Sequence, residues 1–334
     1  LYNRIGMTTN NFLNQSRTAF YITDEMVLDK WRFDVGFRIE STKGTFRRGN
    51  LAESQVYDDA NLTSDLQNVR YTDGTFTTGE IEATDWAVSL AGLYKLTAST
   101  NLYANFSRGF FFPQQRGFAP TPGIRDTNYD AETILQGEIG AKFGTSKFSG
   151  SAAAYYVGLS DRIRIDQAIV NGELVDQGRS EQSTKTLGLE ATGNYKITDA
   201  FTASATLTYQ NHEITTNQTE DLVNGGITTI NEGNEIGRQP NFLGSFALNY
   251  DNSQFDALFS LNHTGAKFTD DTNNVELDAI TIARLGAGYT FKTKDNSNLR
   301  VGFSVFNLFD SSGLTEGNPR AGIAGQSADG DFFY

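Results

Sequence analysis

The chain has 334 residues and a net charge of −13, and it contains no cysteine and only two histidines, His212 and His263. The acidic balance argues against nucleic acid as a partner, because phosphate backbones are bound by basic faces. Without cysteine there is no disulfide framework or thiolate chemistry, and two histidines leave little material for a histidine-rich metal site. We therefore expect no metal and no other cofactor.

The composition favours strands over helices. Glycine is frequent, with 33 residues, proline is rare, with 5, and aromatic residues make up 12% of the chain. Aromatic residues are enriched in β-strands. No run approaches the roughly 18 apolar residues of a membrane helix. A transmembrane β-barrel needs only segments of about 10 residues with alternating polarity, so a membrane location stays open.

Alternation of apolar and polar residues recurs along the whole chain. In 201–209 the residues Phe201, Leu207 and Tyr209 share one face, and Thr206 and Thr208 lie on the other. Period two is a strand signal, because a helix would scramble both faces. In chain order the predicted strands lie near 18–28, 31–42, 84–96, 101–110, 134–144, 147–159, 185–197, 201–214, 238–250, 254–266, 278–292 and 298–309. Most of them match the roughly 9–11 residues with which a tilted strand crosses a bilayer.

The connections between these strands alternate between short and long. The short ones are 29–30, 97–100, 144–146, 198–200, 251–253 and 293–297. The long, polar ones are 43–83, 111–133, 160–184, 215–237, 267–277 and 310–334. Short turns at one end and long loops at the other are typical of an outer-membrane barrel, with the loops on the extracellular side. The sequence therefore predicts an all-β, antiparallel transmembrane barrel with twelve strands in this chain.

Aromatic residues bracket the short turns. Either they form an aromatic girdle at the membrane surface, or they pack across the ends of hairpins. The pairs are Phe143 with Phe148, Tyr195 with Phe201, and Tyr250 with Phe255.

Several segments resemble, in order, those of TonB-dependent receptors. They are AFYITDEMVLDKWRFDVGFRIE (19–40), LYANFSRGFFFPQQRGF (102–118), YDAETILQGEIGAKF (129–143), TLGLEATGNYK (186–196), VFNLFD (305–310) and EGNPR (316–320). The most specific motif is Asn-Leu-Phe-Asp at 307–310. No single motif decides the matter, but together their order and spacing cover essentially the whole chain.

The resemblance implies a barrel of about 22 strands with a plugged lumen. Residues 1–334 would then be a partial barrel domain holding the tenth to twenty-first strands, without the plug domain, the coupling box or the last strand. The chain starts at Leu1 without a signal segment, so we expect it to be a piece of a longer precursor. The implied location is the bacterial outer membrane, with membrane lipid, a small nutrient and TonB as partners. TonB would bind through an N-terminal region outside this chain.

The function implied by the resemblance is active import, in which a nutrient binds to extracellular loops and TonB supplies the energy. The substrate, whether ferric siderophore, glycan, cobalamin or peptide, is left open. A passive porin or structural barrel is the main alternative, and a soluble β-sandwich or adhesin is a third. Catalysis is not expected, because the sequence contains no nucleophile–base set, no phosphate loop and no zinc spacing.

One segment stands out as a candidate ligand site. SRGFFFPQQRGF (107–118) lies at the end of the predicted strand 101–110 and combines aromatic rings with directional donors, which suits an anionic or sugar ligand. The simpler explanation is that the rings anchor the strand end in the outer leaflet. The candidate residues are Arg108, Phe110, Phe111, Phe112, Gln114, Gln115 and Arg116.

Other charged residues have simpler explanations. Alternation points Arg32, Asp34, Arg38 and Glu40 into the lumen, where mutual pairing is favoured over a substrate path. It points His212 lumenward and His263 outward, which argues against a shared site. Acidic loop residues could bind divalent cations through oxygen ligands, although a solvated loop is the simpler expectation. They are Asp58, Asp59, Asp270 and Asp271.

Overall fold

The fold is all-β. The computed structural model describes residues 11–55, 68–112, 131–170, 173–221, 226–292, 297–318 and 331–333. Within these ranges every regular element is a β-strand, and no helix is long and apolar enough to span a bilayer.

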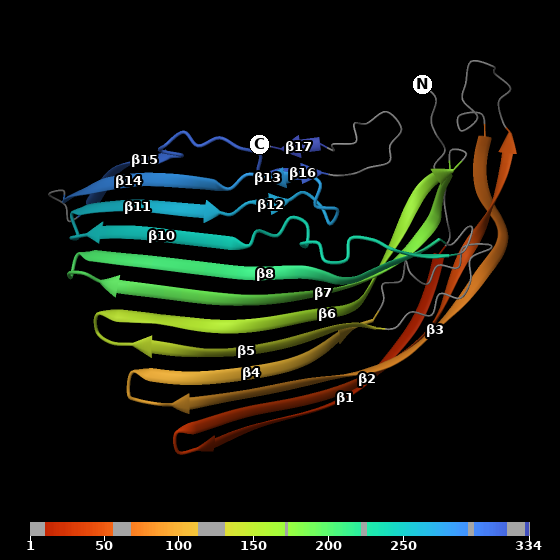
Figure 1. The fold of residues 1–334 in the computed structure, drawn as a ribbon, viewed down its shortest axis with the longest axis horizontal. Coiled ribbons are helices and arrows are strands. Elements are labelled where there is room, and N and C mark those ends of the chain that lie inside the picture. The colour runs from red at the N-terminus through yellow and green to blue at the C-terminus, as the bar shows by residue number, and fades with distance from the viewer. Residues whose placement is uncertain are drawn as a thin grey trace.

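Twelve long strands form one antiparallel sheet, and each pairs with its neighbour along the chain (Figure 1). They are β1 (Asn11–Leu28), β2 (Trp31–Gln55), β3 (Asn68–Lys95), β4 (Thr100–Phe111), β5 (Glu132–Gly144), β6 (Phe148–Val170), β7 (Glu173–Lys196), β8 (Phe201–Asp221), β10 (Phe242–Asp251), β11 (Phe255–Thr264), β14 (Ile280–Lys292) and β15 (Asn298–Phe306). The short strand β9 (Ile227–Thr229) adds to β8, β12 (Lys267–Phe268) pairs with β13 (Glu276–Leu277), and β16 (Glu316–Asn318) pairs with β17 (Asp331–Phe333). The twelve predicted strands and their order are confirmed.

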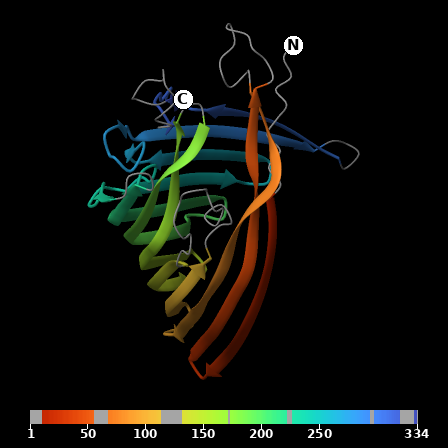
Figure 2. The same ribbon diagram turned by 90° about the vertical axis from the view of Figure 1, so that its right-hand side faces the viewer.

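The sheet is strongly curved but open. Figure 2 shows it bending round from β1 at one edge to β14 and β15 at the other. Among the described residues β1 pairs only with β2, and β15 pairs only with β14. The expectation that the first and last long strands carry unpaired edges is thus confirmed, and the sheet has the form of a section of a barrel wall.

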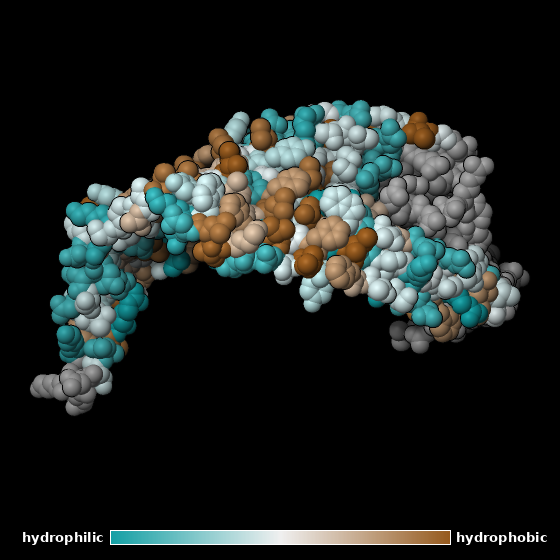
Figure 3. Space-filling model, turned by 90° about the horizontal axis from the view of Figure 1, so that it is seen from below, coloured by the Kyte–Doolittle hydropathy of each residue, from teal (hydrophilic) through white to brown (hydrophobic). Residues whose placement is uncertain are grey.

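The pairing registers give the sheet one apolar and one polar face. Leu207 lies between Ala191 and Gly244, whereas the next residue, Thr206, lies between Thr192 and Ser245. We call the face with Leu207 the apolar face and the face with Thr206 the polar face, and assign other strands by register. The middle of the apolar face, which on β8 runs over 201–209, is the apolar band. Figure 3 shows apolar residues gathered across the middle of the molecule, between hydrophilic ends.

Two expected loops are largely strand, and in this respect the sequence-based prediction was wrong. Residues 43–55 and 68–83 extend the β2–β3 pair, and most of 160–184 extends the β6–β7 pair. Beyond the apolar band the sequence of these segments is mostly polar residues and glycine, with scattered apolar residues such as Phe46 and Ile81. The alternation that marks a strand in the sequence therefore fades, while the backbone pairing continues.

Three of the short turns share one local device. A threonine or asparagine at the start of the turn accepts a hydrogen bond from the backbone N–H three residues later, which stabilises the tight reversal. The bonds run from Phe148 N to Thr145 Oγ1 (3.0 Å), from Phe201 N to Thr198 Oγ1 (3.0 Å) and from Phe255 N to Asn252 Oδ1 (2.8 Å). Each donor is the aromatic residue that begins the next strand.

The aromatic residues beside the turns contact one another across strands, as hairpin-end packing requires. Ring centroids lie 5.2 Å apart for Phe143 and Phe148, 5.3 Å for Phe201 and Tyr250, and 5.8 Å for Tyr250 and Phe255. Their register places these rings on the apolar face. A girdle at a membrane surface is compatible with this arrangement and stays a prediction.

Candidate functional site

Arg108 lies near the end of β4 that is remote from the short turns, which we call the outer end of the sheet. Its guanidinium forms an ion pair with Asp85 at 2.8 Å and lies 4.2 Å above the Trp86 ring, and it also donates to the Trp86 carbonyl. A weaker contact joins it to Thr133 Oγ1 at 3.4 Å. Arg108 thus links β4 to both neighbouring strands, and its charge is largely balanced within the wall.

The phenylalanines beside Arg108 point in different directions. Phe110 and Phe112 contact each other with ring centroids 4.9 Å apart, and Phe112 is only 7% exposed. Phe111 is 56% exposed. By alternation along β4 it lies on the opposite face from Arg108 and Phe110. The structure therefore separates the candidate residues into an anchored set and a single ring, Phe111, that is open to contact.

The remaining candidates, Gln114, Gln115 and Arg116, lie outside the described residues. The same holds for two acidic loop residues, Asp58 and Asp59.

A polar cluster that the sequence did not reveal joins two loops at the outer end. Asp271 Oδ1 accepts a hydrogen bond from Gly237 N, and Asp271 Oδ2 accepts one from Gln182 Nε2, both at 2.9 Å. Asn273 binds the backbone of Glu235 on both sides, accepting from its N–H at 2.7 Å and donating to its carbonyl at 2.9 Å. We call residues 231–241 and 267–277, held together in this way, the loop clip.

The fit within the loop clip is close enough to require glycine at one position. A Cβ atom at Gly237 would lie 2.4 Å from the carbonyl carbon of Asp270, so even alanine would force the backbones apart. The sequence signal for this loop was its Asn, Gly and Pro content, which indicates turns but not which partners they meet.

His212 anchors the loop clip to β8. It is 2% exposed, and its Nδ1 accepts a hydrogen bond of 3.1 Å from Ile236 N. His212 lies three residues beyond the apolar band, and burial lowers its pKa below the ordinary histidine value, opposed by the nearby Glu235 charge. The neutral ring is therefore the stable form here, as a hydrogen-bond acceptor and not as a cation.

The two histidines lie apart, as predicted. His212 shares the polar face with Thr206, and His263 lies on the apolar face, where it contacts Thr281 Oγ1 at 2.8 Å. Among the described residues no group of three histidines or acidic residues could hold a metal ion. Asp271 uses both oxygens as hydrogen-bond acceptors, and Asp270 accepts from Thr272 N at 2.8 Å. The two acidic loop residues within the described ranges, Asp270 and Asp271, thus have structural partners.

The polar face is lined by mutually bound side chains. Arg32 forms ion pairs with Glu25 at 2.8 Å and with Asp34 at 3.2 Å, and Arg38 binds Glu40 at 2.5 Å. The mutual pairing of these residues is as expected.

Two tyrosines of this face lie over glycines of the neighbouring strand. Tyr103 covers Gly140 and donates to Glu138, and Tyr155 covers Gly188 and donates to Gln210 at 3.0 Å. The Tyr155 bond crosses β7 to reach β8, and a Cβ atom at either glycine would lie within 3 Å of the tyrosine ring, so a side chain there would displace the ring.

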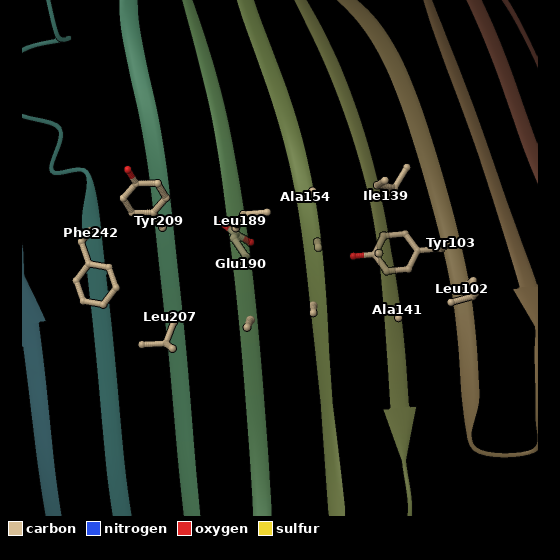
Figure 4. A pocket seen from close by; sticks show the side chains of 14 residues that line it. Leu102, Tyr103, Ile139, Ala141, Ala154, Leu189, Glu190, Leu207, Tyr209 and Phe242 are labelled. Atoms are coloured by element: carbon tan, nitrogen blue, oxygen red, sulfur yellow. The ribbon is translucent and has the colours of Figure 1, made fainter.

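Figure 4 looks onto a broad hollow in the wall between β4 and β10. Its floor carries small residues such as Ala141, Ala154 and Ala191, and its rim carries larger ones such as Leu102 and Leu207. Register places all five on the apolar face. Its lining also includes Tyr103 and Glu190, but most of the lining residues are apolar. The hollow is therefore suited mainly to apolar contact.

Comparison with known proteins agrees with this architecture. The family model described as TonB dependent receptor-like, beta-barrel, matches residues 2–308. The rhizobactin receptor of Rhizobium meliloti (strain 1021) is 23% identical over 259 residues, which make up 73% of this chain and 32% of that protein.

Three solved structures share the fold at low sequence identity. The siderophore receptor PiuA from Acinetobacter baumannii superposes with a TM-score of 0.64 at 18% identity, covering 91% of this chain and 40% of that one. The ferric yersiniabactin uptake receptor FyuA from Yersinia pestis gives 0.63 at 16% identity, covering 96% and 44%. The ferric-catecholate import receptor Fiu from Escherichia coli K12, in its closed form, gives 0.65 at 15% identity, covering 96% and 43%. The chain thus spans less than half the length of each of these relatives.

Proposed function

This chain belongs to the TonB-dependent receptor β-barrel family, and we propose that it is part of a bacterial outer-membrane receptor that imports a scarce nutrient. The match of the family model to residues 2–308 carries this proposal. The relatives are named as receptors, and none of those compared above is named as an enzyme.

The two faces of the sheet support a membrane location. In hydrocarbon every backbone polar group must be paired within the protein, and a closed β-barrel meets this demand. The apolar band would contact lipid, and the ion-paired polar face would line the lumen. The long connections and the loop clip would then lie on the extracellular side, opposite the short periplasmic turns.

We further propose a ferric siderophore as the nutrient. The relatives are a rhizobactin receptor and receptors for siderophores, among them ferric yersiniabactin and ferric catecholates. An iron chelate with carboxylate or catecholate groups would suit the outer end of β4, where Phe111 is open to contact. The candidate ligand residues stay as predicted from the sequence, with Arg108 in a supporting role because Asp85 balances its charge.

Transport would be driven by TonB, acting through an N-terminal region and a plug outside this chain. Uptake of radiolabelled iron tests the proposal, measured in a strain that lacks the complete gene and in the same strain complemented with it. Complementation should restore uptake of at least one ferric siderophore, and an uncoupler or loss of TonB should abolish that uptake.

A passive porin is the alternative function. A porin would pass solutes regardless of the uncoupler, so uptake that resists both treatments would favour it. If deletion of the gene leaves the uptake of every ferric siderophore unchanged, the assignment of iron as the nutrient is refuted.

A further inference from the structure

Asp24 lies on the apolar face of β1, where a charged side chain is out of place. Its register partner is Val35, which in turn pairs with Leu90 on β3. The next residue, Glu25, points to the polar face, where it binds Arg32 at 2.8 Å. Because successive side chains of a strand alternate between faces, Asp24 must point the other way.

The position of Asp24 is at half the height of the apolar band. On β2 this band runs through 31, 33, 35, 37 and 39, all apolar, so Val35 is its midpoint. On β1 itself the nearest residues on the same face are Ile22 and Met26, and both are exposed, at 59% and 41%. Asp24 is thus a carboxylate in the middle of a surface that otherwise suits hydrocarbon.

The described part of the chain offers Asp24 no partner. Its side chain makes no hydrogen bond or ion pair there, and the neighbouring side chains of β2 on this face are Phe33, Val35 and Phe37. Any partner must therefore come from the other side of β1, where the strand has a free edge.

That free edge cannot stay bare in a membrane. Unpaired backbone groups are costly in hydrocarbon, so another strand must pair with β1. A side chain of that strand on the same face, directly opposite Asp24, would have its Cβ about 4.5–5.5 Å from the Cβ of Asp24. Ionisable residues inside membranes are costly unless they are paired, with one another or with backbone carbonyls. The position opposite Asp24 is within reach of an ion pair.

We propose that the strand that pairs with β1 carries an arginine or lysine directly opposite Asp24, forming an ion pair on the lipid-facing surface of the barrel. The pair fixes the register between this sheet and the rest of the wall, because a slip by one residue would turn the cation to the lumen. The inference rests on the proposed membrane location, but that location alone does not predict a cation opposite Asp24.

Replacement of Asp24 in the complete protein tests the pair. Asp24→Leu should lower the amount of folded receptor in outer membranes several-fold, measured by heat-modifiable gel mobility, because it leaves a cation alone in lipid. Ile22→Leu, on the same face of the same strand, is the matched control and should leave that amount unchanged. If Asp24 is unpaired, leucine removes a cost, and an equal or larger folded amount would overturn the proposal.

A second measurement uses the unaltered protein and does not depend on folding of a variant. Dicyclohexylcarbodiimide labels protonated carboxyl groups in hydrocarbon, so an ion-paired Asp24 should stay unlabelled in isolated membranes. Labelling of Asp24 overturns the proposal. If Asp24→Leu folds poorly in membranes but normally as the purified protein without other subunits, the cation lies on another subunit. That result would also overturn the proposal.

Failure of the membrane location itself is recognised separately. Leu207→Arg, far from β1, would then be tolerated, whatever the behaviour of Asp24.

Discussion

Gln182 and Asp271 are 89 positions apart, yet the Gln182 side-chain amide donates a 2.9 Å hydrogen bond to the Asp271 carboxylate. Gln182 belongs to β7 and Asp271 to the loop between β12 and β13, so the bond spans β8 and the 231–241 loop. The other Asp271 oxygen holds Gly237 N at 2.9 Å. One carboxylate therefore ties three separate segments of the outer end together.

Asp271→Ala should loosen the loop clip. It leaves the Gln182 amide, on a residue only 2% exposed, without its acceptor, and such a loss costs about 1–3 kcal/mol. Hydrogen exchange at Gly237 N should rise accordingly. Asp270→Ala is the control, because Asp270 Oδ1 binds only its near neighbour Thr272 in the contacts described. Equal protection of Gly237 in both variants would contradict this role for Asp271.

Acid should also loosen the loop clip, through His212. Its folded pKa is lowered by burial, so below about pH 6.5, the ordinary histidine value, the unfolded form takes up a proton that the folded form resists. Stability is therefore complete above that pH and falls as the pH drops toward the folded pKa. Exchange at Ile236 N, the donor to His212 Nδ1, should accelerate in this window.

His212→Asn is the control for the acid effect, because its side-chain oxygen can accept the Ile236 hydrogen bond but does not titrate. The variant should show no acceleration between neutral pH and pH 5. If it loosens as much as the parent, the effect arises elsewhere, for example at Glu235.

Gly188→Ala should destabilise the wall. A Cβ atom there would lie 2.2 Å from the Tyr155 ring, and overpacking of this kind costs about 1–3 kcal/mol. Gly137→Ala is the matched control, since a Cβ atom would meet nothing within 4 Å. The folded fraction after a heat step should fall for Gly188→Ala and be partly restored by adding Tyr155→Ala. If Gly188→Ala and Gly137→Ala lower the folded fraction equally, the placement of the Tyr155 ring does not depend on glycine at position 188.

Leu207→Arg should impair assembly far more than Thr206→Arg. On the lipid face near the bilayer midplane an arginine costs roughly 2–4 kcal/mol, whereas the lumen tolerates charge. The amount of folded receptor in outer membranes measures the difference. Similar amounts for the two variants would mean that the apolar face does not contact lipid.

Phe111→Ala, combined with Arg116→Ala, should lower nutrient binding while the amount of folded receptor at the cell surface stays the same. Phe111 is 56% exposed and Phe112 is 7% exposed, so Phe112→Ala should instead reduce the folded amount. Binding can be followed with the ferric siderophore that the uptake assay identifies. If the first variant binds normally, the segment is structural and the ligand site lies elsewhere.

Much of the wall could be predicted from the sequence, because alternation is a local signal. The opposite orientation of Leu207 and Thr206 follows from their parity within a regular strand, and so does the pairing of Arg32 with Asp34 on one face. Strand ends beyond the apolar band were missed where polar residues and glycine predominate and the alternation weakens, as in the β2–β3 ribbon up to Gln55.

The contacts at the outer end could not be predicted in the same way. Nothing in the local sequence of Asp271 indicates that Gln182 will meet it, because that meeting depends on how two loops fold back over β8. Arg108 illustrates the opposite difficulty. An arginine suits an anionic ligand, but the neighbouring strand β3 places Asp85 and Trp86 in contact with the Arg108 guanidinium.

The order of the long strands has an evolutionary consequence. Each long strand between β1 and β15 pairs with the long strands before and after it in the chain, so the backbone pairing of a hairpin involves only its two flanking strands. Duplicating or deleting one hairpin would leave the backbone pairing within every other hairpin intact and would only widen or narrow the sheet. A gene with this architecture can therefore change the number of strands in its protein by copying a short stretch of DNA, while the rest of the sequence stays as it is.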